Sequence, residues 1–266
     1  MEYTRYRLDP RLSSVLGRLS TSKFPESGQQ LMDKLPQLVA AAAPTPTGDA
    51  LERTLAPFRW FLERGDGEGL PLTQAGYLKP ADVKQVAALL PTMTDWIFPV
   101  TREVNTQPVL GFRDRVQRMG LLRKRKGALL TTRLGRSLNH PGALWDHIVD
   151  SLIPEGHDFD TDAAVLIAIH FAAEPGRRVD PYGIAATLGQ LGWAREGGFP
   201  VQADDLHWRI NDVWHLLGNI GPSSGSRRER TPSPEAVALV RDALVSETFT
   251  QHRETTRLTG DFRESR

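Results

Sequence analysis

The segment from Val109 to Leu138 constrains the fold of this chain more than any other part of it. Its apolar residues first recur at steps of three, four and three, which predicts a helix with one buried face and an opposite face of mostly basic residues. These apolar residues are Val109, Phe112, Val116 and Met119. Gly120 is expected to end the helix, because glycine adopts the left-handed capping conformation without a steric clash.

A β-hairpin is predicted directly after this helix. Leu121 and Leu122 begin a short strand, residues 123–127 form a charged turn, and residues 128–130 return as a second strand. Thr131 or Thr132 can cap the following helix, because its side-chain oxygen accepts hydrogen bonds from free backbone N–H groups. The predicted fold class is therefore mainly α with small β-hairpins, an α+β fold.

Positive charge is concentrated in the same segment. From Arg113 to Arg136 there are nine basic residues and one acidic residue, whereas the whole chain has 33 basic and 32 acidic residues. The remainder of the chain therefore has 24 basic against 31 acidic residues. Such a local excess favours attraction to a phosphate backbone. The alternative is a solvated basic surface that serves solubility or a protein contact.

The segment resembles the recognition helix and wing of winged-helix transcription regulators. In many of them the second wing strand leads into a Leu-Thr-x-x-Gly turn, which occurs here at residues 130–135 with one inserted residue. An uninterrupted copy occurs at residues 72–76. Both copies are similar to actinobacterial hypothetical proteins with repeated Leu-Thr-x-x-Gly units. The resemblance implies tandem winged-helix-like units that bind DNA or protein.

Five segments are predicted along the chain. Two N-terminal helices end in a linker rich in proline. Two winged-helix-like units follow, of which the second has the basic wing. A third, degenerate unit repeats the order of helices, basic turn and Thr-Pro, which is an organisational signal. The predicted segments are 1–49, 50–107, 108–154, 155–246 and a polar tail at 247–266.

The sequence predicts a non-enzymatic protein that binds double-stranded DNA as a regulator or accessory factor. Basic residues of the helix would approach the major groove, and those of the wing would contact phosphates or the minor groove. The predicted DNA-binding residues are Arg113, Arg115, Gln117, Arg118, Arg123, Lys124, Arg125, Lys126 and Arg133. The alternative function is a protein interaction scaffold that binds an acidic protein or a second copy in a homo-oligomer.

No catalytic residues and no cofactor are predicted. The chain has no Gly-x-Ser-x-Gly elbow, no Gly-x-x-x-x-Gly-Lys phosphate loop and no Gly-x-Gly-x-x-Gly fingerprint. It has no cysteine, which excludes disulfides and thiolate metal sites. The first residues lack an apolar signal core, and no run has the roughly 20 apolar residues needed to cross a bilayer. We therefore expect a cytoplasmic protein without a membrane partner.

Two patterns suggest a metal site, but we expect none. Asp158, Asp160 and Asp162 alternate as at the start of a calcium loop, but the glycine and glutamate that such a loop needs are missing. We expect Asp160 or Thr161 to cap a helix instead. His207 and His215 lie two helical turns apart with no third strong ligand.

Overall fold

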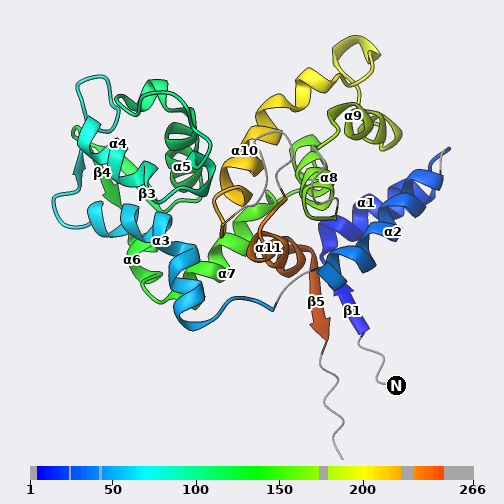
Figure 1. Cartoon of the computed structure of the whole chain (residues 1–266). Coiled ribbons are helices and arrows are strands. Elements are labelled where there is room, and N and C mark those ends of the chain that lie inside the picture. The colour runs from blue at the N-terminus through cyan, green and yellow to red at the C-terminus, as the bar shows by residue number, and fades with distance from the viewer. Residues whose placement is uncertain (1–4, 24, 42–43, 174–178, 223–230, 249–266) are drawn as a thin grey trace, which may run out of the picture.

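The chain forms two bodies that lie side by side (Figure 1), as described by a computed structural model. One body contains a three-stranded sheet, and the other is a helical bundle. The structure describes residues 5–23, 25–41, 44–173, 179–222 and 231–248. The prediction of a mainly helical chain with small antiparallel strands is confirmed.

The sheet-bearing body is built from one continuous stretch of the chain. Its sheet has the order β2-β4-β3, and both strand pairs are antiparallel. The elements are α3 (Gly48–Arg64), β2 (Leu70–Pro71), α4 (Pro80–Ala87), α5 (Gln107–Arg118), β3 (Leu122–Arg125), β4 (Ala128–Thr131) and α6 (Arg133–Ser137), with 3-10 turns at Pro91–Met93 and Glu103–Asn105.

Strand β2 connects the two segments that were predicted to separate at residue 107. Leu70 of β2 pairs with Leu129 of β4, so residues on both sides of that boundary share one sheet. The predicted units 50–107 and 108–154 are therefore not arranged as two separate sheets. The sequence does not show which strand pairs with β2, because that partner lies about 60 residues later in the chain.

The core of this body forms where α3 meets α5. Phe58 and Phe61 of α3 both contact Phe112 of α5, with ring centroids 4.8 and 6.2 Å apart. The four apolar residues predicted to line the inner face of α5 are all buried. The prediction of which side of α5 is buried in the core is therefore confirmed.

The second body is a bundle built around α8. This helix is apolar around nearly its whole circumference, and it is buried by α1, α2, α9, α10 and α11. The bundle helices are α1 (Pro10–Ser20), α2 (Pro25–Ala41), α7 (Pro141–Leu152), α8 (Phe159–Ala173), α9 (Pro181–Gln190), α10 (His207–Leu217) and α11 (Pro234–Leu244), with 3-10 turns at Glu196–Gly198 and Ala203–Leu206.

The two ends of the described chain meet in a second sheet. Strand β1 (Arg5–Leu8) pairs antiparallel with β5 (Val245–Thr248) (Figure 1). Residues 247 and 248 therefore belong to a strand and not to a polar tail, while residues 249–266 lie outside the described residues. The N-terminal helices do not form a separate segment, because they pack on α8 and α11.

The bodies meet where α5 packs on α10 and α3 packs on α7. The predicted third unit, 155–246, has its helices in the expected order. Its predicted basic turn falls on residues 223–230, outside the described residues.

Candidate nucleic-acid interface

The predicted wing is the hairpin β3–β4, and its strands are longer than expected. Only Lys126 and Gly127 form the turn, with φ of 48° and 74°. Two successive residues with positive φ are typical of a tight turn that follows the twist of a hairpin. Residues 123–125 therefore belong to β3 and not to the turn, so their side chains alternate between two faces.

The strand register assigns each basic side chain to a face. Arg123 lies opposite Leu130, and Arg125 lies opposite Ala128, so these two guanidinium groups share one face of the hairpin. Lys124 lies opposite the buried Leu129 and points to the other face. All four residues from Arg123 to Lys126 are exposed. None of the four forms an ion pair with any residue that the structure describes.

The prediction that Arg113 lies on an exposed helix face is wrong. Its side chain is only 2% exposed, and its Nε lies 3.1 Å from Oε1 of Glu103. Its Nη1 also donates to the carbonyl oxygen of Gly76. Glu103 precedes α5 in a loop, so no helical periodicity could have indicated this partner.

Glu103 is itself fully buried and carries the charge that neutralises Arg113. Its Oε2 accepts a hydrogen bond of 2.6 Å from the backbone N–H of Leu78. Burial raises the pKa of Glu103, and the positive charge of Arg113 opposes that rise. Through these bonds the pair connects the 3-10 turn before α5 and α5 itself to residues 76–78, which follow β2.

Arg115 is also buried, so its prediction as a groove-facing residue is wrong as well. Its Nη1 lies 2.5 Å from Oδ2 of Asp212 on α10. Burial lowers the pKa of Arg115, and the carboxylate of Asp212 opposes that change. Arg118 is partly exposed, and it also donates to Asp212. Both arginines thus tie α5 to the bundle.

The face of α5 that points away from the sheet is covered by α10. Gly111 lies against the imidazole ring of His215, and Gln117 is only partly exposed. Burial lowers the pKa of His215. The face that would enter a DNA groove is therefore occupied by the bundle in this arrangement. Asp212 and His215 were not predicted as its partners, since nothing in their own helix indicates a contact with residues about 100 positions away.

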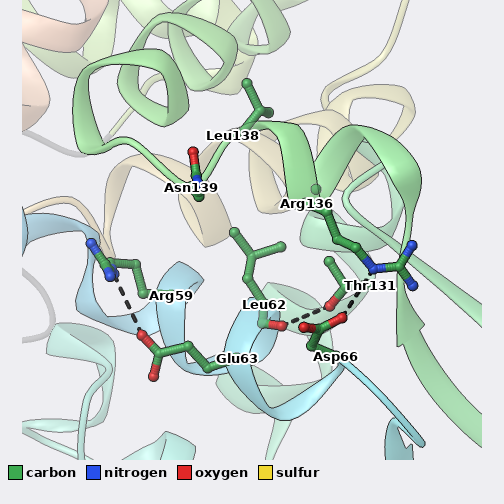
Figure 2. Close-up of a pocket in the computed structure, with 9 residues that line it drawn as sticks. Arg59, Leu62, Glu63, Asp66, Thr131, Arg136, Leu138 and Asn139 are labelled. Atoms are coloured by element: carbon green, nitrogen blue, oxygen red, sulfur yellow. Dashed lines mark hydrogen bonds and ion pairs between the residues drawn. The ribbon is translucent and has the colours of Figure 1, made fainter.

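A cleft of about 480 Å³ lies between α3 and α6, close to the hairpin (Figure 2). Arg59 is paired with Glu52, and Arg136 is paired with Asp66. The hydrogen bond from Arg136 lowers the pKa of Asp66. Because both arginines are neutralised, this cleft offers no excess positive charge. Arg133, the last predicted DNA-binding residue, is exposed and has no ion pair among the described residues.

The residues that suggested metal binding have separate roles. Asp158, and not Asp160 or Thr161, caps α8, because its Oδ1 accepts from the backbone N–H of Thr161. Asp160 pairs with Arg209, while Asp162 pairs with Arg18. Within the described ranges, no three side chains of His, Asp or Glu gather in a way that could hold a metal ion.

No protein-family model matches this chain, and no curated protein or solved structure matches it. Among the helices of the described residues, none combines the length and apolar character needed to span a bilayer. A functional proposal therefore depends on the geometry of the chain itself.

Proposed function

We propose that this chain binds double-stranded DNA through the hairpin β3–β4, as a regulator or accessory factor without catalytic activity. One observation carries this proposal. Four consecutive cationic side chains, Arg123 to Lys126, are exposed on the hairpin β3–β4 and have no ion pair among the described residues. Such a group favours contact with phosphates, because binding releases the counterions that DNA otherwise holds.

The order of elements supports a winged-helix-like unit over residues 48–138. Helix α3 is followed by an edge strand, two further helices and a hairpin that completes the sheet. In this unit α5 takes the place of the recognition helix and β3–β4 takes the place of the wing. Because α10 covers α5, the wing is the part that remains available to DNA.

A repeat in the sequence supports a second unit of the same kind. Residues 98–100 are Phe-Pro-Val, and residues 199–201 are again Phe-Pro-Val, 101 positions later (199 − 98 = 101). At the same offset, buried Val83 corresponds to buried Ile184, and Val116 corresponds to Leu217. The prolines that begin α4 and α9 also differ by 101 positions (181 − 80 = 101). An approximate repeat of a supersecondary unit favours duplication.

The helix caps at Thr132 and Ser233, which are 101 positions apart, are also similar. Thr132 accepts from the N–H of Gly135 and donates to the carbonyl of Gly120. Ser233 and Ala236 stand at the offset of 101 from Thr132 and Gly135, and Ser233 accepts from the N–H of Ala236. Ser233 also donates to the carbonyl of Ile220, which is 100 positions after Gly120. We therefore infer two units, 48–138 and 159–244, in place of three, packed through their corresponding helices α5 and α10.

This arrangement favours binding with little sequence preference. Contacts to phosphates position a protein on DNA but do not distinguish bases, whereas base contacts require a helix or strand in a groove. Arg113 and Arg115 are buried, so the base-reading role expected for them is replaced by a structural one.

A salt titration of DNA binding tests the proposal. The variant R123Q/K124Q/R125Q/K126Q removes the wing charges, and a matched control, K23Q/R53Q/K79Q/K84Q, removes four exposed charges elsewhere. The wing variant should lower the slope of log affinity against log salt by about 0.9 for each phosphate that the protein no longer touches. The control variant should keep the slope of the original protein.

An equal slope in the wing variant and the original protein contradicts the proposal. It would favour the scaffold function, for which the exposed pair Ile97 and Phe98 is the relevant surface, being 82% and 56% exposed. Light scattering of the intact chain, compared with I97S/F98S, would then detect self-association. A deletion of residues 1–43 cannot serve as a test of self-association, because α1 and α2 pack within the bundle core and their loss would disrupt the fold.

A further inference from the structure

A cavity of about 480 Å³ lies between α5, α7 and α10, where the two bodies meet. Cavities of this size at the contact between two bodies are common binding places for small molecules. Its lining is dominated by polar side chains. The lining residues that carry the argument are Arg115, Arg118, His147, Trp208, Arg209 and Asp212.

Three guanidinium groups in this lining share one buried carboxylate. Arg115 and Arg209 lie 2.5 and 3.3 Å from Oδ2 of Asp212. Arg118 contacts the other oxygen of the same carboxylate. Arg209 also reaches Asp160, which is about half exposed at 52%. The buried wall therefore has more positive than negative charge, an arrangement that favours an anion.

Two further carboxylates line the cavity, and they must be included in this charge balance. Asp150 and Glu155 are both exposed, and neither has an ion pair among the described residues. Water screens exposed charges far more strongly than buried ones. Asp150, Glu155 and Arg118 are exposed, whereas Arg115, Arg209 and Asp212 are buried. The buried part of the lining therefore holds two guanidinium groups against one carboxylate.

An aromatic surface lies next to the arginines. The guanidinium carbons of Arg118 and Arg209 lie 5.6 and 4.4 Å from the ring centroid of Trp208. This indole is 53% exposed although it lines the cavity. Stacking of this kind holds a guanidinium in place and leaves its edge free to donate hydrogen bonds.

We propose that this cavity binds a small phosphorylated molecule or free phosphate. A phosphate group carries about −1.5 to −2 charge near neutral pH and has three acceptor oxygens, so several guanidinium groups can bind it at once. Arg115 also donates to the carbonyl oxygen of Ser151, and Arg209 also pairs with Asp160. Together with Asp212, these acceptors occupy only part of the donor capacity of the three arginines, because each arginine has five N–H donors. The phosphate would lie beside Arg118, the most exposed of the three.

Thermal unfolding with inorganic phosphate, titrated against chloride at constant ionic strength, tests this site. The intact chain should show a saturable rise in Tm. In R118Q the apparent Kd should rise at least tenfold. The control R136Q removes another partly exposed and ion-paired arginine, and it should bind phosphate as the original protein does. W208A, which leaves all three arginines in place, should also weaken binding.

Several outcomes would overturn the site. A rise in Tm that does not saturate would show that phosphate has no defined site on the protein. If R118Q and W208A respond to phosphate as the original protein does, phosphate binds elsewhere. An equal response to citrate would reject phosphate as the ligand class. The variant R123Q/K124Q/R125Q/K126Q separates this site from the DNA proposal. It should lose DNA affinity but keep the phosphate response of the original protein. Loss of the phosphate response in that variant would assign phosphate to the wing.

Discussion

Gly111 of α5 lies directly against the imidazole ring of His215 of α10. A Cβ atom at Gly111 would stand 2.1 Å from Nε2 of that ring, far inside van der Waals contact. Helices that approach this closely need a residue without a side chain at the contact. The absence of a side chain at Gly111 therefore makes room for the His215 ring between α5 and α10.

Gly111→Ala should destabilise the chain. Overpacking at a fixed contact costs about 1–3 kcal/mol, which exceeds the gain of up to about 1 kcal/mol from the better helix propensity of alanine. Chemical unfolding measures the difference. Gly17→Ala is the matched control, because Gly17 is helical and has nothing within 4 Å of its Cβ position. A Gly111→Ala chain as stable as the control would contradict the close contact.

Asp212→Asn should cost about 3–5 kcal/mol of unfolding free energy, because it leaves buried arginines without their charged partner. Urea unfolding followed by far-UV circular dichroism is a suitable measurement. Glu52→Gln breaks an ion pair that is half exposed, and it should cost no more than about 1 kcal/mol. If Asp212→Asn and Glu52→Gln lose similar amounts of unfolding free energy, Asp212 does not neutralise the arginines between α5 and α10.

Acid should weaken the chain through His215. Burial lowers its pKa in the folded state, an effect opposed by Asp212 and strengthened by Arg118. A lowered pKa means that the unfolded chain binds the proton more readily, so the stability from this group is present above about pH 6.5 and lost as pH falls. His215→Gln should flatten the dependence of unfolding free energy on pH below about pH 6.5. An unchanged dependence would rule out His215 as its source.

The two repeated helix caps should differ in strength. Thr132→Ala and Ser233→Ala each remove a side chain that caps a helix and also donates to a backbone carbonyl, that of Gly120 or of Ile220. A cap is worth about 0.5–2 kcal/mol. Ser233 is only 2% exposed, so its loss should lie at the upper end, and that of Thr132 at the lower end. Guanidinium unfolding measures the loss of unfolding free energy in each variant. A larger loss in Thr132→Ala than in Ser233→Ala would contradict this prediction.

Local patterns predicted α5, the hairpin and a cap at Thr131 or Thr132, because their signals lie within one turn or one strand pair. The structure places that cap at Thr132. The burial of Arg113 and Arg115 could not be predicted in this way. Helical periodicity placed both on the outer face, and their partners Glu103 and Asp212 come from a loop and from a distant helix. A charged residue reveals its burial only when its counterion is known, and that contact is tertiary.

The same distinction applies to the candidate site. The cations at positions 123–126 were predicted from composition and are exposed in the structure. Their run of charge predicted a turn over residues 123–127. The pairing of β3 with β4 instead places residues 123–125 in a strand, where their side chains alternate between two faces. The cavity between α5, α7 and α10 was not predicted at all, because its lining comes from three separate segments.

The bundle is assembled from chain on both sides of the sheet-bearing body, and this determines the order of events on the ribosome. Synthesis completes the sheet-bearing body at α6, before α8 and α11 exist to cover α1 and α2. Domains generally fold as units while the chain emerges. For that interval α5 has no α10 beside it, and Arg115 is still without Asp212. Every newly made molecule therefore passes through a stage in which the outer face of α5 is open to solvent and to any ligand that reaches it first.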